Sequence, residues 1–349
     1  MIIYRLLVPF LALASLAANA QDFRSLRYLD QVPVPSYKTE GGFAVQQPMK
    51  CGLDGVLYVR FASASSEPAV TLIGDDGKVI SNIRLSKIPE FSQNDFYDVA
   101  PANGEVFVLS GKGKLHSPTM TNYYVSRFKI DGTYISSAAL DIGFRPDFEP
   151  RGLAAFPSGN LLISGMAKGH DVPFVPFAAI FTETGQFLHQ VILNDDVTDK
   201  DARQKPTDSS FSPVQQERNL IEVTFLRTAD DGNVYLTRNT PRGPVFIVAP
   251  GGSARRVTLA PPVKGADLEG VMASGGLLVA QYRSPEGPER HTHYLVVMEI
   301  SGKKIRETAR YVHEYEKNAV GMSCYRDGTY TFIAGAPGGG LQLVRAAVQ

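Results

Sequence analysis

The segment CGLDGVLYVRF, residues 51–61, contains a pattern that recurs along the whole chain. A pair of small turn residues, here Asp54-Gly55, stands directly before an apolar strand. Related segments start near Val99, Leu153, Leu226, Gly270 and Met322. Asp-Gly, Asn-Gly and Ser-Gly pairs favour tight turns, and the residues that follow alternate or run apolar, as strands require. Each copy is therefore predicted to be a β-hairpin.

A second hairpin follows each of the first five copies. Its turns lie at Asp76-Gly77, Asp131-Gly132, Thr184-Gly185, Gly251-Gly252 and Ser301-Gly302. Two hairpins give four strands in about 45 to 55 residues, the length of one propeller blade. The sequence thus predicts an all-β fold for residues 21–349, a single six-bladed β-propeller with four-stranded antiparallel blades. The polar residues 194–219 are predicted to form a loop inserted between blades 3 and 4.

The last copy of the pattern predicts how the ring closes. After Met322 the chain has room for three strands only, so the sixth blade lacks its fourth. A strand near Leu26 to Val32 is predicted to be the outermost strand of that blade. Pairing the two ends of the chain closes the ring and covers an exposed sheet edge. A disordered leader is the alternative for these residues.

The first twenty residues are predicted to be a signal peptide. Arg5 provides a positive charge, Leu6 to Leu16 is almost entirely apolar, and Ala18-Asn19-Ala20 fits the small-x-small cleavage rule. Cleavage is expected after Ala20, and the absence of a cysteine there argues against a lipoprotein. An uncleaved anchor is the alternative, but the apolar run is short for a membrane span. We expect a periplasmic or secreted protein without a transmembrane anchor after cleavage.

The charge balance limits the range of partners. Lys plus Arg and Asp plus Glu both number 35, which gives a formal net charge of zero. A nucleic-acid-binding protein needs a basic excess or a basic stripe to neutralise phosphates, and neither is present. We therefore expect that the protein binds no nucleic acid. We also expect it to be a monomer.

The repeat pattern resembles the NHL-type repeats of six-bladed propellers, and also the TolB-like and SMP-30/gluconolactonase-like groups. Asp54-Gly55, Val59, Asp76-Gly77 and Lys78 carry the resemblance in the first unit. It covers nearly all of the chain after the signal peptide. The resemblance implies the fold, but these repeats are shared by enzymes, receptors and scaffolds, so it does not imply one activity.

The two cysteines of the chain occupy equivalent repeat positions. Cys51 stands three residues before Asp54, and Cys324 three residues before Asp327. If the ring closes, they lie on neighbouring innermost strands. A disulfide is chemically allowed in an exported protein, and two buried free thiols acting as small apolar residues are the alternative.

Polar residues near the innermost strands are the candidate site. The channel candidates are Lys50, Asp98, Arg151, Arg227, Asp267 and Glu269. Asp98 and Glu269 belong to units two and five, so their carboxylates are expected to face each other across the channel. They could bind Ca²⁺ or another divalent cation, or they could form ion pairs with the basic residues.

Two classes of function follow from these residues. The first is a binding module that recognises a protein, peptide or glycan through the channel mouth and the inserted loop. The second is a metal-dependent hydrolase or lactonase, which the gluconolactonase-like resemblance implies through Asp98 and Glu269. No complete catalytic set is evident in the sequence, which favours the binding module.

Overall fold

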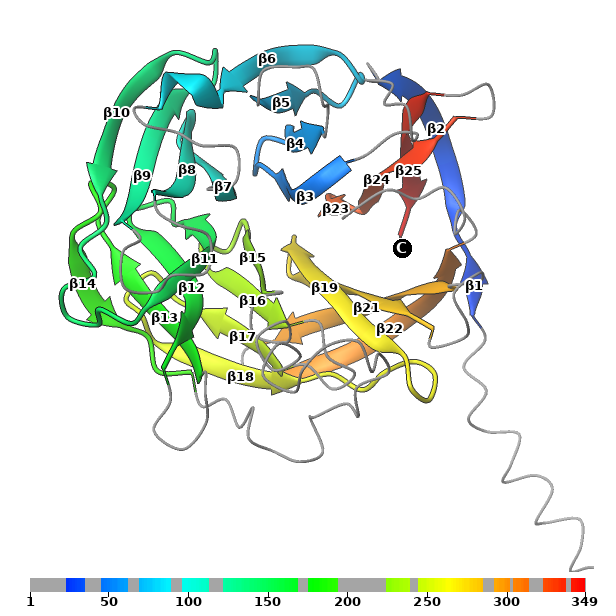
Figure 1. The fold of residues 1–349 in the computed structure, drawn as a ribbon. Coiled ribbons are helices and arrows are strands. Elements are labelled where there is room, and N and C mark those ends of the chain that lie inside the picture. The colour runs from blue at the N-terminus through cyan, green and yellow to red at the C-terminus, as the bar shows by residue number, and fades with distance from the viewer. Residues whose placement is uncertain are drawn as a thin grey trace, which may run out of the picture.

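The computed structural model describes residues 23–34, 45–61, 69–88, 96–112, 122–168, 175–193, 224–238, 244–284, 292–301, 304–313, 323–336 and 340–348. Six sheets surround a common axis, and each sheet is one blade (Figure 1). Blade 1 contains β3 (Val45–Cys51), β4 (Leu57–Phe61), β5 (Ala69–Ile73) and β6 (Val79–Arg84). Blade 2 contains β7 (Phe96–Ala102), β8 (Glu105–Lys112), β9 (Asn122–Lys129) and β10 (Tyr134–Ala139). Blade 3 contains β11 (Glu149–Ala155), β12 (Leu161–Ala167), β13 (Val175–Phe181) and β14 (Phe187–Gln190).

The second half of the chain repeats this arrangement. Blade 4 contains β15 (Thr224–Thr228), β16 (Val234–Arg238), β17 (Pro244–Val248) and β18 (Ala254–Thr258). Blade 5 contains β19 (Asp267–Ser274), β20 (Leu277–Arg283), β21 (His293–Ser301) and β22 (Lys304–His313). Blade 6 contains β23 (Cys324–Arg326), β24 (Thr329–Gly335), β25 (Leu341–Ala347) and β2 (Arg27–Val34). The predicted all-β, six-bladed propeller is confirmed.

The ring closes through the N-terminal strand, as predicted. β2 pairs antiparallel with β25, in a register that runs from Arg27 opposite Ala347 to Val34 opposite Leu341. The dark blue ribbon therefore lies beside the red one in Figure 1. One feature was not predicted: the short strand β1 (Arg24–Ser25) pairs in parallel with β22 of blade 5. The N-terminal segment thus joins blades 5 and 6.

The predicted outer turns also fix how neighbouring blades pack. Gly77 and Gly132 have φ values of 75° and 87°, a conformation that favours glycine. A Cβ on Gly132 would lie 2.6 Å from the carbonyl oxygen of Asn82 in blade 1, and one on Gly77 would lie 2.7 Å from that of Pro33 in β2. The outer turn of each of these blades therefore packs against the outermost strand of the preceding blade, and β2 occupies that place in blade 6.

The hydrophobic core consists of six buried clusters, one between each pair of adjacent blades. A blade has two apolar faces, so it can be buried only by its neighbours. Burial of one large apolar side chain contributes about 1.5–3 kcal/mol, and each cluster contains several. In the described residues the one helical element is a 3₁₀ turn, η1 (Leu85–Lys87). No described helix has the length and apolarity to span a membrane.

Candidate functional site

Four of the innermost strands are irregular near candidate residues. The pairing register shifts between Gln46 and Lys50, between Phe96 and Asp98, between Pro150 and Gly152, and between Leu268 and Gly270. Such β-bulges change the direction of side chains along a strand. The shifts bracket or adjoin Lys50, Asp98, Arg151 and Glu269. A local irregularity in blades 1, 2, 3 and 5 thus influences the direction in which these side chains leave their strands.

Lys50 links four blades inside the ring. Its ammonium nitrogen Nζ lies 2.8 Å from a carboxylate oxygen of Asp98 in blade 2. It also donates hydrogen bonds to the carbonyl oxygens of Leu153 in blade 3, at 3.0 Å, and Leu226 in blade 4, at 2.8 Å. The side chains of Lys50 and Asp98 are only 7% and 5% exposed. The buried ion pair and the two hydrogen bonds thus join blades 1 to 4 inside the ring.

Protein donors surround the carboxylate of Asp98. Its Oδ1 accepts a hydrogen bond from the backbone N–H of Val99 at 2.8 Å, and its Oδ2 accepts one from Leu153 at 2.7 Å. Burial raises the pKa of Asp98, while Lys50 and these N–H groups oppose the rise. Burial likewise lowers the pKa of Lys50, against the attraction of Asp98. Two buried charges of opposite sign therefore compensate each other.

Arg151 belongs to a separate group in blades 2 and 3. Its Nη2 donates to Glu149 at 2.9 Å, and its guanidinium lies 4.7 Å from the centroid of the Tyr97 ring. The ring centroids of Tyr97 and Tyr123 are 5.7 Å apart. Burial raises the pKa of Tyr123 to about 12. Arg151 is thus neutralised by Glu149 and stacked on an aromatic ring.

Asp267 and Glu269 lie on β19. Glu269 accepts a hydrogen bond from Gln281 Nε2 at 2.9 Å, and its carboxylate lies 2.9 Å from His293 Nδ1 and 3.6 Å from Arg283 Nε. Burial opposes ionisation of Glu269, but the His293 hydrogen bond and the other partners outweigh it, so its pKa is lowered. Burial is the main cause that raises the pKa of Asp267, which Arg283 opposes.

The structure therefore holds Asp98 and Glu269 in two different networks. Within the described ranges, no three His, Cys, Asp or Glu side chains are grouped so that they could hold a metal ion. A divalent cation at Asp98 and Glu269 stays a prediction. The same applies to the signal peptide at residues 1–20 and the inserted loop at residues 194–219, which lie outside the described residues.

A cavity of about 200 Å³ opens at one end of the channel. It is lined by the turns that follow the innermost strands of blades 1, 4 and 6 and by the end of β19 in blade 5. Arg227 was among the predicted channel residues, but a cavity at the turns that follow these strands was not predicted. The lining residues with charged groups, a hydroxyl group or sulfur include Cys51, Arg227, Asp230, Ser274, Arg326 and Asp327.

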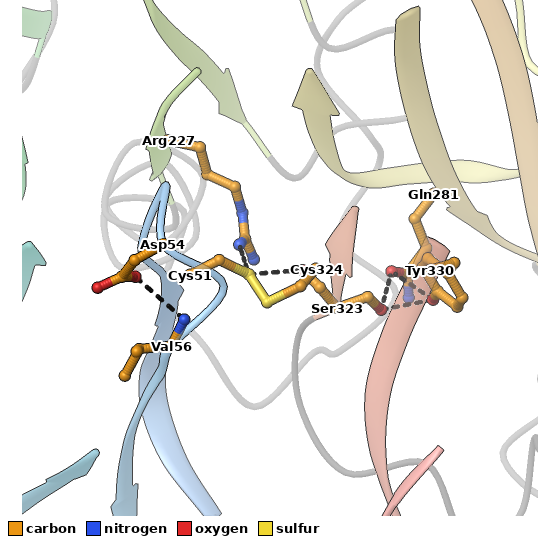
Figure 2. The surroundings of a disulfide bond; sticks show 8 residues. All are labelled: Cys51, Asp54, Val56, Arg227, Gln281, Ser323, Cys324 and Tyr330. Carbon is orange, nitrogen blue, oxygen red and sulfur yellow. Dashed lines mark hydrogen bonds between the residues drawn. A yellow bond between two sulfur atoms is a disulfide. The ribbon is translucent and has the colours of Figure 1, made fainter. Parts of the chain in front are cut away.

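Arg227 is the more buried of the two arginines that line this cavity. Its Nη1 donates to Cys51 Sγ at 3.3 Å, and Figure 2 shows the guanidinium directed at that sulfur. No carboxylate of the described residues forms an ion pair with it. Burial lowers the pKa of Arg227 to about 10, against the attraction of Tyr330 and Asp98. Arg227 therefore stays charged at neutral pH.

The predicted disulfide between Cys51 and Cys324 is confirmed. The two Cα atoms are 5.9 Å apart, within the usual range for a disulfide. The bond joins β3 of blade 1 to β23 of blade 6 across the place where the ring closes (Figure 2). The cavity thus has a disulfide and a guanidinium in contact on its wall.

Comparisons with known proteins identify no family. No protein-family model matches the chain, and no curated protein does. A subtype N10 neuraminidase-like protein of A/little yellow-shouldered bat/Guatemala/060/2010 is 11% identical, with a TM-score of 0.49, and the match covers 92% of this chain and 99% of that one.

Two further solved structures give similar values. A protein of unknown function from Bacteroides caccae is 14% identical, with a TM-score of 0.45, and the match covers 83% of this chain and 100% of that one. A subtype N11 neuraminidase-like protein of A/flat-faced bat/Peru/033/2010 is 10% identical, with a TM-score of 0.46, and the match covers 94% and 96%. At such identities and TM-scores these likenesses bear on neither family nor function. The resemblance to the NHL, TolB and SMP-30 groups stays a prediction.

Proposed function

We propose that this protein is an exported binding module whose partner, a peptide, protein or glycan, inserts an acidic group into the cavity beside Arg227. The observation that supports this is a guanidinium that lines a cavity of about 200 Å³ without a carboxylate partner among the described residues. A charge removed from water is costly unless it is paired. A carboxylate on the ligand would supply the missing partner. Guanidinium groups bind carboxylates with two parallel hydrogen bonds.

The other charges of the cavity leave this role to Arg227. Arg326 forms an ion pair with Asp327 at 3.2 Å, and both side chains are more than half exposed. Asp230 accepts hydrogen bonds from the hydroxyl of Ser274 and the N–H of Gly275, at 2.9 and 2.8 Å. These groups lie at the rim with partners of their own. The guanidinium of Arg227 is more buried than these groups, and no carboxylate of the described residues forms an ion pair with it.

The size of the cavity limits what enters it. Sites for drug-sized molecules measure about 300–1,000 Å³. A cavity of about 200 Å³ accommodates a single residue of a larger ligand, such as a chain-terminal amino acid or one acidic sugar. The rest of the partner would lie on the surrounding turns. The inserted loop at residues 194–219 is a second contact predicted from the sequence.

The alternative, a metal-dependent hydrolase that uses Asp98 and Glu269, has no comparable support. Each carboxylate is held by protein donors: Asp98 by Lys50 and two N–H groups, and Glu269 by Gln281 and His293. A metal would have to displace those partners.

An array of immobilised peptides and oligosaccharides tests the proposal. It contains peptides with a free C-terminal carboxylate, oligosaccharides that contain uronic acids, and the amidated or neutral counterpart of each. The wild-type protein should retain acidic members above their counterparts. Arg227→Gln should weaken retention about tenfold or more, the effect of losing one charged hydrogen bond. Arg306→Gln, which changes an exposed guanidinium on β22, is the matched control and should leave retention unchanged. Equal retention by wild type and Arg227→Gln would contradict the proposal.

A further inference from the structure

The two sulfur atoms of the Cys51–Cys324 disulfide have different surroundings. Cys51 is partly exposed and lines the cavity, whereas Cys324 is only 8% exposed. The guanidinium of Arg227 lies 3.3 Å from the sulfur of Cys51 (Figure 2). The disulfide therefore has one sulfur that is accessible and next to a cation, and one that is shielded.

This asymmetry matters for thiol chemistry. The thiolate is the reactive form of cysteine, and a neighbouring cation lowers the thiol pKa. In the dithiol form, Arg227 would stabilise a thiolate at Cys51. The other charged groups of the cavity have closer partners: Arg326 with Asp327, and Asp230 with Ser274 and Gly275.

The ion pair of Lys50 with Asp98 is the other charged pair near β3, and its ammonium group is not directed at the sulfur of Cys51. Lys50 precedes Cys51 in the chain, but its ammonium group is bound to Asp98 and to two carbonyl oxygens across the channel. Its charge is largely compensated by Asp98. Arg227 is thus the cationic group, among the described residues, that contacts the sulfur of Cys51.

We propose that Cys51 and Cys324 form a thiol–disulfide exchange site for small thiols, in which Cys51 is the exchanging sulfur and Cys324 the resolving one. A thiolate from a small thiol enters the cavity and attacks Cys51 Sγ. A mixed disulfide forms at Cys51, the Cys51–Cys324 bond breaks, and Cys324 leaves with the electron pair and takes a proton from water. A second thiolate of the same kind then attacks the small-thiol sulfur of the mixed disulfide. This releases the oxidised small-thiol disulfide and leaves Cys51 as a thiolate beside Arg227.

The surrounding structure keeps Cys324 in place when the bond opens. The hydroxyl of Ser323, the residue before it, donates to Gln281 of blade 5 at 2.8 Å and also contacts the hydroxyl of Tyr330. The outer closure of the ring is a separate contact, the antiparallel pairing of β2 with β25. The blades therefore stay assembled, and Cys324 can attack the mixed disulfide at Cys51 to restore the original bond.

The first experiment measures the two thiols separately. The protein is reduced under native conditions and alkylated with iodoacetamide at a series of pH values, and peptide mass spectrometry follows each cysteine. We expect Cys51 to react with a midpoint at least about one pH unit below the ordinary thiol value of about 8.5, and Cys324 at or above that value. Similar profiles for the two cysteines, both near the ordinary value, would overturn the proposal.

The second experiment follows exchange itself. The oxidised protein is incubated with reduced glutathione, quenched with acid, and mapped for the mixed disulfide. We expect glutathione on Cys51, formed without denaturant. Mixed disulfide on Cys324 alone, or none until denaturant is added, would overturn the assignment.

Variants of Arg227 separate its charge from its packing. Arg227→Gln should raise the alkylation midpoint of Cys51 by about one pH unit and slow glutathione exchange about tenfold, whereas Arg227→Lys should stay close to wild type. Arg306→Gln is the control for a lost surface charge. An Arg227→Gln profile that matches wild type would overturn the role of the guanidinium. The alkylation midpoint needs no acidic ligand, so it stands or falls independently of the acidic partner proposed above; the exchange rate does not, because glutathione itself carries carboxylates.

Discussion

Two blade interfaces of this propeller are built in different ways. Between blades 2 and 3 the buried cluster contains several aromatic rings, among them Phe107, Phe148 and Phe181. Between blades 6 and 1, the described buried cluster consists of aliphatic residues, Met49 and one cysteine of the disulfide, without an aromatic ring. Each of the other five clusters contains at least one Phe or Tyr.

The difference follows from the order of the chain. Blades 2 and 3 are consecutive, so their interface forms from neighbouring segments. Blades 6 and 1 contain the two ends of the fold, and the cysteines that join them are 273 residues apart. The entropy cost of closing a loop rises with its length. The interface between blades 6 and 1 has two features that offset this cost, a covalent bond at the channel and the pairing of β2 with β25 at the outside.

Removal of the outer strand should have the largest effect on this closure. A chain that starts at residue 35 lacks β2, which leaves β25 as an open edge and removes the buried side chain of Val34 from the cluster. We expect it to lose a cooperative unfolding transition. Thermal unfolding monitored by circular dichroism provides the measurement. A chain that starts at Leu26 lacks β1 but keeps β2, and it should still unfold cooperatively. A cooperative transition at the full-length temperature in the shorter chain would show that β2 is dispensable.

Truncation of one aromatic side chain at the interface between blades 2 and 3 should have the next largest effect, a loss of stability. Phe148 is 1% exposed, and its ring centroid lies 4.8 Å from that of Phe177. Phe148→Ala leaves a cavity and should lower the free energy of unfolding by about 3–5 kcal/mol. Urea denaturation measures the change. Leu188→Ala, at a position that is 44% exposed, is the control and should change stability little. Equal effects of the two substitutions would argue against a packed interface here.

Loss of the disulfide should lower the free energy of unfolding somewhat less than loss of the Phe148 side chain. The double substitution Cys51→Ala with Cys324→Ala should lower the free energy of unfolding by about 2–4 kcal/mol, because the bond restricts the unfolded chain. The outer pairing of β2 with β25 should keep the native fold, which the near-ultraviolet circular dichroism spectrum would show. A urea midpoint equal to that of the oxidised wild type would mean that the covalent bond adds nothing to the closure.

The sequence was informative wherever structure depends on local turns. Asp-Gly and Ser-Gly pairs predicted the hairpins, and the missing fourth strand of the last repeat predicted that residues near Leu26 to Val32 close the ring. The equivalent positions of Cys51 and Cys324 made a disulfide one of two possibilities for these residues. The structure contains that disulfide. Each of these inferences needs only the repeat period and the two ends of the chain.

The site was less predictable, because its contacts cross the ring. Lys50 and Asp98 were both identified as channel residues, but the bulges that bring them together leave no clear mark in the sequence. The position of Arg227 against Cys51 depends on how blades 1 and 4 face each other. The parallel strand β1 also escaped prediction, since two residues are too few to show a pattern.

The smallest expected effect concerns an ion pair on the outer side of the closure. Arg345 of β25 donates a hydrogen bond to Asp30 of β2 at 2.7 Å, and this bond lowers the pKa of Asp30. A lowered carboxyl pKa stabilises the fold above the unfolded-state value of about 3.9, and that stability is lost as the pH falls through the folded-state value. Both side chains are partly exposed, so Asp30→Asn should lower the free energy of unfolding by less than about 1 kcal/mol at pH 7.

Urea denaturation of wild type and Asp30→Asn at several pH values tests the sign of this effect. The difference between the two proteins should be constant above about pH 5 and should shrink as the pH falls below about 4. Glu299→Gln removes the partner of Arg306 in a pair exposed on blade 5, and it should have no measurable effect at any pH. A difference for Asp30→Asn that persists unchanged in acid would mean that the substitution acts through packing of β2. The outer closure would then depend on strand pairing without help from this charge pair.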